Sequence, residues 1–197
     1  VEGGRLELMY GSFEIPSGNL GQIPNWFLEV RQGDFSIRQC QVRSLFSDQT
    51  QSHGLIRWQA EISDESSKAD QTKQHSALIR DSFLAADGTL IDAQMPQRKL
   101  FVDNSVLASR ENLFSFNLSG AGDELSGTAV LTHCTLSSIQ NFLTVKSVNP
   151  SSPSNSSLQI FADHCVFGSP MKGGGSGDLA TLMTVDPQIL EQNKLQW

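Results

Sequence analysis

The sequence predicts an all-β fold of parallel strands wound into a single-stranded β-helix of about six coils, closed by a short C-terminal helix. Three observations support this. A seven-residue segment recurs five times in one frame, and a second strand-like segment accompanies each copy. The length between copies varies only in stretches rich in Ser, Gly, Asp and Pro, which are typical of surface loops.

The recurring segment has apolar second and seventh positions, a small fifth position and a polar fourth position. The copies are SIRQCQV (36–42), LIRDSFL (78–84), FVDNSVL (101–107), VLTHCTL (130–136) and FADHCVF (161–167). Four matching columns over five segments predict stacked coils that share one shape.

The polar fourth column predicts a sharp bend between two strands, because Asn, Asp and His adopt positive φ more readily than other non-glycine residues. The column contains Gln39, Asp81, Asn104, His133 and His164. Stacked at the strand spacing of roughly 4.8 Å, these side chains are expected to form a ladder.

The fifth column, which contains only Cys and Ser, is predicted to point into a narrow core. Three cysteines and no C-x-x-C motif favour free thiols over a disulfide framework or a zinc site. We therefore expect Cys134 and Cys165 to be reduced and buried.

The second family of segments alternates as a half-buried strand does, with every second side chain facing inward. The segments are NWFLEV (25–30), GLIRWQ (54–59), TLIDAQ (89–94), NLFSFN (112–117), NFLTVK (141–146) and DLATLMT (178–184). The predicted inward pairs are Leu28/Val30, Ile56/Trp58, Ile91/Ala93, Phe114/Phe116, Leu143/Val145 and Ala180/Leu182.

These patterns predict one domain over residues 1–197, which we interpret as a segment of a larger protein. Residues 1–24 are predicted to form a degenerate first coil without a clean small column, and residues 25–184 the regular coils. Residues 185–197 are predicted to form a capping helix, with Asp186 as its N-cap and Pro187 in its first turn.

The repeat motif resembles that of the right-handed parallel β-helix superfamily, which includes pectate lyases and polygalacturonases. The resemblance covers residues 25 to 185 and implies a right-handed helix. The segments AVLTHCTLSS and LQIFADHCVFGSP also look like coil segments in the extracytoplasmic C-terminal regions of large bacterial serine/threonine protein kinases. The chain itself contains no kinase motif. This second resemblance implies an extracytoplasmic or periplasmic location, which the residues alone do not indicate.

Composition and charge argue against two classes of partner. The net charge is −7 and the pI is near 5.0, whereas a nucleic-acid surface needs clustered Lys and Arg. No run of 18 apolar residues is present, so we expect no membrane insertion by this segment.

Two groups of residues are candidate sites, each with a structural alternative. Glu29, Arg57 and Asp92 share an outward column, which is suited either to acid–base chemistry on a glycan or to an alternating charge stack. His133 and His164 could begin a metal site, but as members of the bend ladder they are expected to bind none. Asp163, the nearest carboxylate, is expected to point elsewhere. No cofactor is implied.

The sequence therefore favours a non-catalytic β-helical module that acts as a rigid spacer or as a recognition surface for a glycan or protein. The alternative is a polysaccharide-active lyase or glycoside hydrolase, or a fragment of one.

Overall fold

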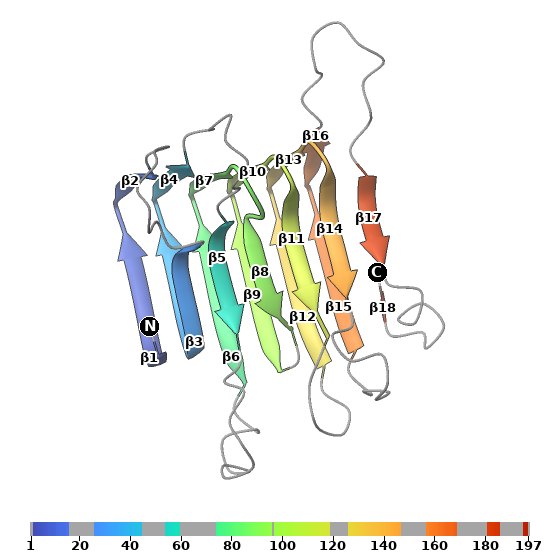
Figure 1. The fold of residues 1–197 in the computed structure, drawn as a ribbon, viewed down its shortest axis with the longest axis horizontal. Coiled ribbons are helices and arrows are strands. Elements are labelled where there is room, and N and C mark those ends of the chain that lie inside the picture. Colours follow the sequence, from blue (N-terminus) through green and yellow to red (C-terminus); the bar gives the residue numbers. More distant parts are fainter. Residues whose placement is uncertain are drawn as a thin grey trace, which may run out of the picture.

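The structure, a computed structural model, describes residues 2–15, 26–44, 54–59, 74–95, 97–118, 126–146, 157–168, 181–185 and 195–196. Within these residues the chain is all-β, as predicted, and its strands succeed one another along the long axis of the molecule (Figure 1). No helix occurs in the described part of the chain, so no helix there is long and apolar enough to span a membrane.

The strands belong to three sets that alternate along the chain. The first set is β1 (Glu2–Met9), the second half of β3 (Trp26–Arg38), β6 (His75–Arg80), β9 (Arg98–Asp103), β12 (Ser126–Thr132), β15 (Ser157–Asp163) and β18 (Leu195–Gln196). The second set is β2 (Ser12–Ile15), β4 (Gln41–Ser44), β7 (Phe83–Ala86), β10 (Val106–Ser109), β13 (Thr135–Ser138) and β16 (Val166–Gly168). The third set is the first half of β3, β5 (Gly54–Gln59), β8 (Ile91–Gln94), β11 (Asn112–Asn117), β14 (Asn141–Lys146) and β17 (Thr181–Val185).

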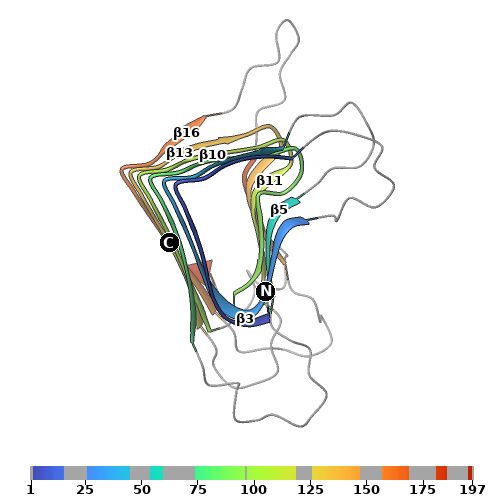
Figure 2. The same ribbon diagram turned by 90° about the vertical axis from the view of Figure 1, so that its left-hand side faces the viewer.

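Within each set, every strand pairs in parallel with the members before and after it. The second set makes a six-stranded sheet, and the first and third sets join through the long strand β3 into a 12-stranded sheet. Seen along the stack, the strands of successive repeats overlie one another around a shared interior (Figure 2). We call one strand from each set, taken in chain order, a rung. The first rung is β1, β2 and the first half of β3, and the sixth is β15, β16 and β17.

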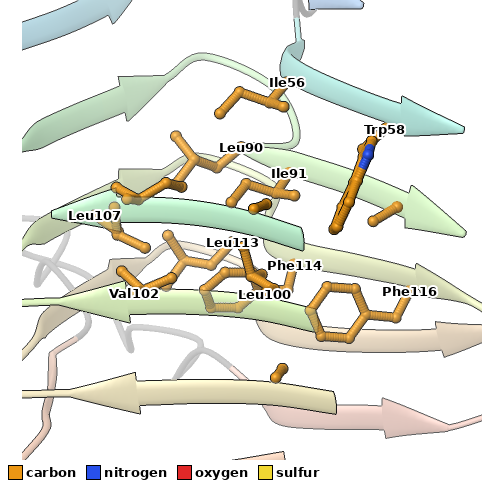
Figure 3. Packing of buried hydrophobic residues seen from close by; sticks show 14 of the residues in the cluster. Ile56, Trp58, Leu90, Ile91, Leu100, Val102, Leu107, Leu113, Phe114 and Phe116 are labelled. Carbon is orange, nitrogen blue, oxygen red and sulfur yellow. The ribbon is translucent and has the colours of Figure 1, made fainter. Parts of the chain in front are cut away.

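The interior is filled by apolar columns, one side chain from each rung (Figure 3). Leu84 and Leu107, and likewise Ile79 and Val102, are aligned neighbours in adjacent strands and are almost fully buried. Burial of each such side chain stabilises the fold by about 1.5–3 kcal/mol. Trp58 also lies in the interior, where its indole Nε1 donates a 2.9 Å hydrogen bond to the carbonyl of Gly33.

The register of the third set confirms the inward pairs up to β14 but corrects the last one. Met183 aligns with Leu143 and Val185 with Val145, and both pack against the core. Leu182 points outward and is 56% exposed, while Ala180 lies outside the described residues. The predicted register was off by three residues, and a shift by any odd number moves every side chain to the opposite face of the strand.

Two further expectations about the ends are corrected. Residue Val185 belongs to β17, and Leu195–Gln196 form β18, which pairs with β15; the predicted helix over 185–197 is therefore wrong at these positions. Residues 186–194 lie outside the described chain. The first rung does have a small column, because Gly11 occupies the position that Cys40 holds in the second rung.

Candidate functional site

The bend between the first and second strands of each rung carries the predicted ladder. Its residues all have positive φ, between 45° and 56°: Tyr10, Gln39, Asp81, Asn104, His133 and His164. The Asn104 side-chain amide donates a 2.6 Å hydrogen bond to the Asp81 carboxylate. The imidazoles of His133 and His164 are stacked, with centroids 5.2 Å apart and an angle of 18° between ring planes. The ladder interpretation of these two histidines is thus confirmed.

The carboxylate of Asp103, the residue before the ladder position Asn104, contacts side chains of both neighbouring rungs. It accepts a 2.8 Å hydrogen bond from the Thr132 hydroxyl and lies 3.3 Å from Arg80 Nε and 3.6 Å from His133 Nδ1. The pKa of Asp103 is held below its usual value, chiefly by the Thr132 hydrogen bond and then by His133 and Arg80. This carboxylate is therefore an ionised acceptor and is poorly suited to be a general acid.

Asp163 does not point away from the ladder as expected. Its Oδ1 lies 2.8 Å from Nδ1 of His164, its immediate neighbour in the chain. Both side chains are well exposed, so an ion pair between them is worth little in water.

The contacts of the two histidines bear on the metal hypothesis. Nδ1 of His133 faces the carboxylate of Asp103 in the preceding rung, whereas Nδ1 of His164 faces Asp163 of its own rung. No three His, Cys, Asp or Glu side chains within the described ranges are grouped so that they could hold a metal ion. A protein zinc site needs three or four ligands.

The Ser and Cys side chains of the small column have a hydrogen-bonding pattern in common besides their small size. Each side chain donates to the carbonyl two residues earlier: Ser82 to Arg80 at 2.7 Å, Ser105 to Asp103 at 2.8 Å and Cys134 to Thr132 at 3.1 Å. The Ser105 hydroxyl also accepts from the Ser82 amide of the preceding rung at 3.2 Å. The carbonyls of Arg80, Asp103 and Thr132 also accept a backbone amide from the preceding rung, so the side-chain donor adds a second hydrogen bond at each.

The three cysteines are free thiols but differ in burial. Cys40 and Cys134 are buried as expected, whereas Cys165 is only half-buried because it belongs to the last complete rung. Burial raises the pKa of the Cys134 thiol to about 11, and the Cys165 thiol beside it adds to the rise. Cys134 is consequently a protonated thiol at neutral pH.

The structure brings Glu29, Arg57 and Asp92 into one outward column, as predicted. Arg57 Nε lies 3.7 Å from Asp92 Oδ2, and the Asn117 amide donates to Asp92 Oδ1 at 3.1 Å. Glu29 is instead bound by Arg31, whose Nη2 lies 3.1 Å from Oε1. The column therefore contains two separate ion pairs rather than two carboxylates turned toward a common point.

A second polar ladder runs along the start of the third strands, and the sequence analysis missed it. Asn112 donates to the Thr89 hydroxyl at 3.1 Å and accepts from the Asn141 amide at 3.0 Å and the Thr144 hydroxyl at 2.8 Å. Thr184 continues the ladder with a 3.2 Å hydrogen bond to Asn141. The signal was available: Thr89, Asn112 and Asn141 each follow a small-column residue by seven positions.

Two buried charged groups also went unpredicted. Arg98 occupies an inward position of β9, where its guanidinium lies 5.2 Å from the Trp58 ring centroid and donates from Nη1 to the Gln94 carbonyl at 2.7 Å. Burial lowers the pKa of Arg98 to about 10, so the side chain stays charged at neutral pH. At another bend, the buried Asp87 carboxylate accepts a 2.9 Å hydrogen bond from Arg110.

The outer face of the first set of strands carries an apolar column. Its members are aligned across neighbouring strands, and two are aromatic and exposed, Phe101 at 38% and Phe161 at 50%. Leu78 and Val130 complete it. An exposed apolar column is unusual for a surface without a partner, which makes this face a candidate for recognition.

Comparison with known proteins adds no further identification, since no family model, curated protein or solved structure matches the chain. The class of protein that the fold and the site define is a repetitive all-β protein of stacked parallel strands.

Proposed function

We propose that this chain is a right-handed parallel β-helix of about six coils that serves as a non-catalytic module of a larger bacterial protein. Its role is that of a rigid spacer, with a recognition surface as the second candidate. The region that follows a serine/threonine kinase domain is one context that agrees with the sequence resemblance.

The observation that carries this proposal is that the outward polar side chains bond to one another along the stack. Asp81 is bonded by Asn104, Asp103 by Thr132, Asp92 by Asn117 and Asn112 by Asn141. Each contact joins neighbouring rungs, so the side chains stiffen the stack. Polar side chains that are bonded to one another in this way stabilise the stack, which favours a structural role over a catalytic one.

The competing function, an enzyme acting on polysaccharide, depends on Glu29 and Asp92. The two carboxylates lie on either side of Arg57, two strand spacings or roughly 9.6 Å apart at the backbone. An inverting glycosidase separates its carboxyl groups by roughly 6.5–9.5 Å, which keeps this alternative testable. Against it stands the pairing of each carboxylate with its own partner, Arg31 or Asn117.

The test is incubation of the purified chain with a panel of neutral and acidic polysaccharides, followed by measurement of new reducing ends and unsaturated sugar products. A spacer yields neither product, and the Asp92→Asn variant behaves as the parent. Turnover that disappears in Asp92→Asn but persists in the matched control Asp81→Asn, on a different face, would establish the enzyme instead.

The recognition surface is supported by the apolar column that contains Phe101 and Phe161. Electrophoresis through gels that contain single polysaccharides compares the parent with the double variant Phe101→Ser/Phe161→Ser. Phe83→Ser, an equally exposed aromatic on the second set of strands, is the control. Retardation lost only in the double variant supports recognition of glycans, and unretarded migration of all three proteins leaves the spacer role.

A further inference from the structure

We propose that Cys134 and Cys165 form a reversible disulfide that joins the fifth and sixth rungs. This modification site goes beyond the proposed spacer role and does not depend on it. The two thiols are free in the structure, and they are the only neighbouring cysteines in the small column of the described rungs.

The register places the two residues at equivalent points of adjacent rungs. Thr132 pairs with Asp163 before the bend, and Thr135 pairs with Val166 after it. Cys134 and Cys165 occupy the same position between these pairs. The preceding residues, His133 and His164, stack with their ring centroids 5.2 Å apart, which agrees with side chains in register on adjacent rungs at this corner.

This spacing is compatible with a disulfide that carries some strain. Aligned Cα atoms of adjacent parallel strands are roughly 4.8 Å apart, inside the range of roughly 4.4–6.8 Å that a disulfide bridges. Parallel side chains keep their Cβ atoms at nearly the same separation, slightly beyond the usual roughly 3.5–4.5 Å. Closing the bond therefore needs a sub-ångström approach of the two rungs, and a strained disulfide is the more easily reduced kind.

The sixth rung is the one that can make this approach. Cys165 is half-buried, and its inward neighbour Phe167 is 45% exposed, whereas the inward residues of inner rungs are almost fully buried. The Cys165 thiol also reaches back toward the fifth rung, where it donates to the Leu131 carbonyl at 3.5 Å. Exposure makes Cys165 the entry point for an oxidant, and Cys134 is the resolving thiol.

A low-molecular-weight disulfide such as oxidised glutathione is a sufficient oxidant. The Cys165 thiolate attacks one of its sulfurs, forms a mixed disulfide and releases one glutathione thiolate. The Cys134 thiolate then attacks Sγ of Cys165, which forms the protein disulfide and releases the second glutathione thiolate. Two protein thiols are oxidised, one glutathione disulfide is reduced, and the two thiol protons pass to solvent or to the released thiolates.

The experiment treats the native 197-residue chain with oxidised glutathione and maps its cysteines by mass spectrometry without reduction. Free thiols should fall from three to one, with a Cys134–Cys165 cross-link and a free Cys40. Reduced glutathione should reverse the cross-link. Because the pKa of Cys134 is raised to about 11, closure of the mixed disulfide should accelerate between pH 7 and pH 9.

Serine variants provide the controls, since Ser82 and Ser105 already occupy the same column. Cys134→Ser should stop at the glutathione adduct on Cys165, Cys165→Ser should give no cross-link, and Cys40→Ser should match the parent. Trapping the parent with iodoacetamide should modify Cys165 first, which tests its role as entry point without a variant. A stable adduct on Cys165 without a cross-link in the parent, or a cross-link formed only in denaturant, would overturn the proposal.

Discussion

At the scale of single residues, the bends show how one dihedral angle selects the residue types of a column. The ladder positions all have positive φ, a conformation that Asn and Asp tolerate best. The next position must be small, and the Ser and Cys that fill it after Gly11 of the first rung also donate a hydrogen bond. The size restriction was evident in the sequence, whereas the donated hydrogen bond emerged only from the contacts.

The Ser105→Leu substitution should destabilise the protein strongly. Ser105 is 3% exposed, and an additional isobutyl group overpacks a filled core at a cost of about 1–3 kcal/mol. Loss of its hydroxyl also removes the acceptor for the Ser82 amide, which adds about 1–3 kcal/mol. Chemical denaturation of parent and variant measures the difference. Thr135→Leu, at an exposed outward position after the equivalent bend of the next rung, is the control and should leave the midpoint nearly unchanged.

Asp103 should contribute stability that is lost in acid. Its pKa is lower in the folded chain than in the unfolded chain, so the contribution is complete above the unfolded pKa of about 3.9 and disappears as pH falls through the folded value. The gap in unfolding free energy between the parent and Asp103→Asn should therefore narrow as pH falls from 6 toward 3.

Thr132→Val tests the cause of that effect, because it removes the hydrogen bond that lowers the pKa of Asp103 most. Its unfolding free energy should be lower than that of the parent at pH 6 and should fall less as pH drops toward 3, because the folded pKa of Asp103 then lies closer to the unfolded value. A gap between parent and Asp103→Asn that stays constant from pH 6 to pH 3 would show that this carboxylate titrates alike in both states.

At the scale of the strand and bend, the sequence predicted the strands with one clear alternation correctly. It failed for a strand whose residues fit two registers. The 178–185 segment carries apolar residues on both parities, so Ala180/Leu182 and Met183/Val185 fitted the pattern equally. Pairing with β14 selected the second register. Tyr10 was not among the predicted ladder residues, and a bulky aromatic residue seldom adopts positive φ.

Interior charge could not be inferred from the pattern at all. Arg98 holds an inward position that aligns with His75 in the preceding rung, and its charge is accommodated by the Trp58 ring and the Gln94 carbonyl. These partners are four and forty residues away, so only the three-dimensional arrangement identifies them. The column of Glu29, Arg57 and Asp92 was predicted, but not its division into two ion pairs.

The double variant His133→Asn/His164→Asn should keep its fold, because asparagine already serves this ladder at Asn104. Loss of the ring stack is worth about 0.5–1.5 kcal/mol, so the melting temperature should fall by only a few degrees. Calorimetric titration of the parent with zinc or nickel should detect no stoichiometric site. Micromolar metal binding by the parent that is absent from the double variant would restore the metal hypothesis.

At the scale of the whole molecule, each rung contacts only its neighbours, so stability should be unevenly distributed along the stack. The central rungs have neighbours on both sides and a nearly inaccessible core, while several inward residues of the first and sixth rungs, such as Phe13 and Phe167, are half-buried or exposed. In such a stack, local unfolding begins at the ends, where a rung has only one neighbour.

Native-state amide hydrogen exchange should reveal this gradient. Amides of β7, β9 and β11 should be the slowest, and protection should decline toward β1 at one end and β16 at the other. Equal protection along all rungs would mean that the stack opens only as a single cooperative unit.

The corners of the rungs differ in how freely their length can change. The first bend consists of two residues in every rung from Tyr10–Gly11 to His164–Cys165, because the positive φ of its first residue and the small size of its second fix the spacing. The corner between the third strand and the next rung has no such restriction: β8 and β9 are joined by residues 95–97, whereas β5 and β6 are separated by residues 60–74. Insertions and deletions during evolution are therefore confined to certain edges of the stack, and these edges are where foreign peptides or whole domains can be grafted without disturbing the register.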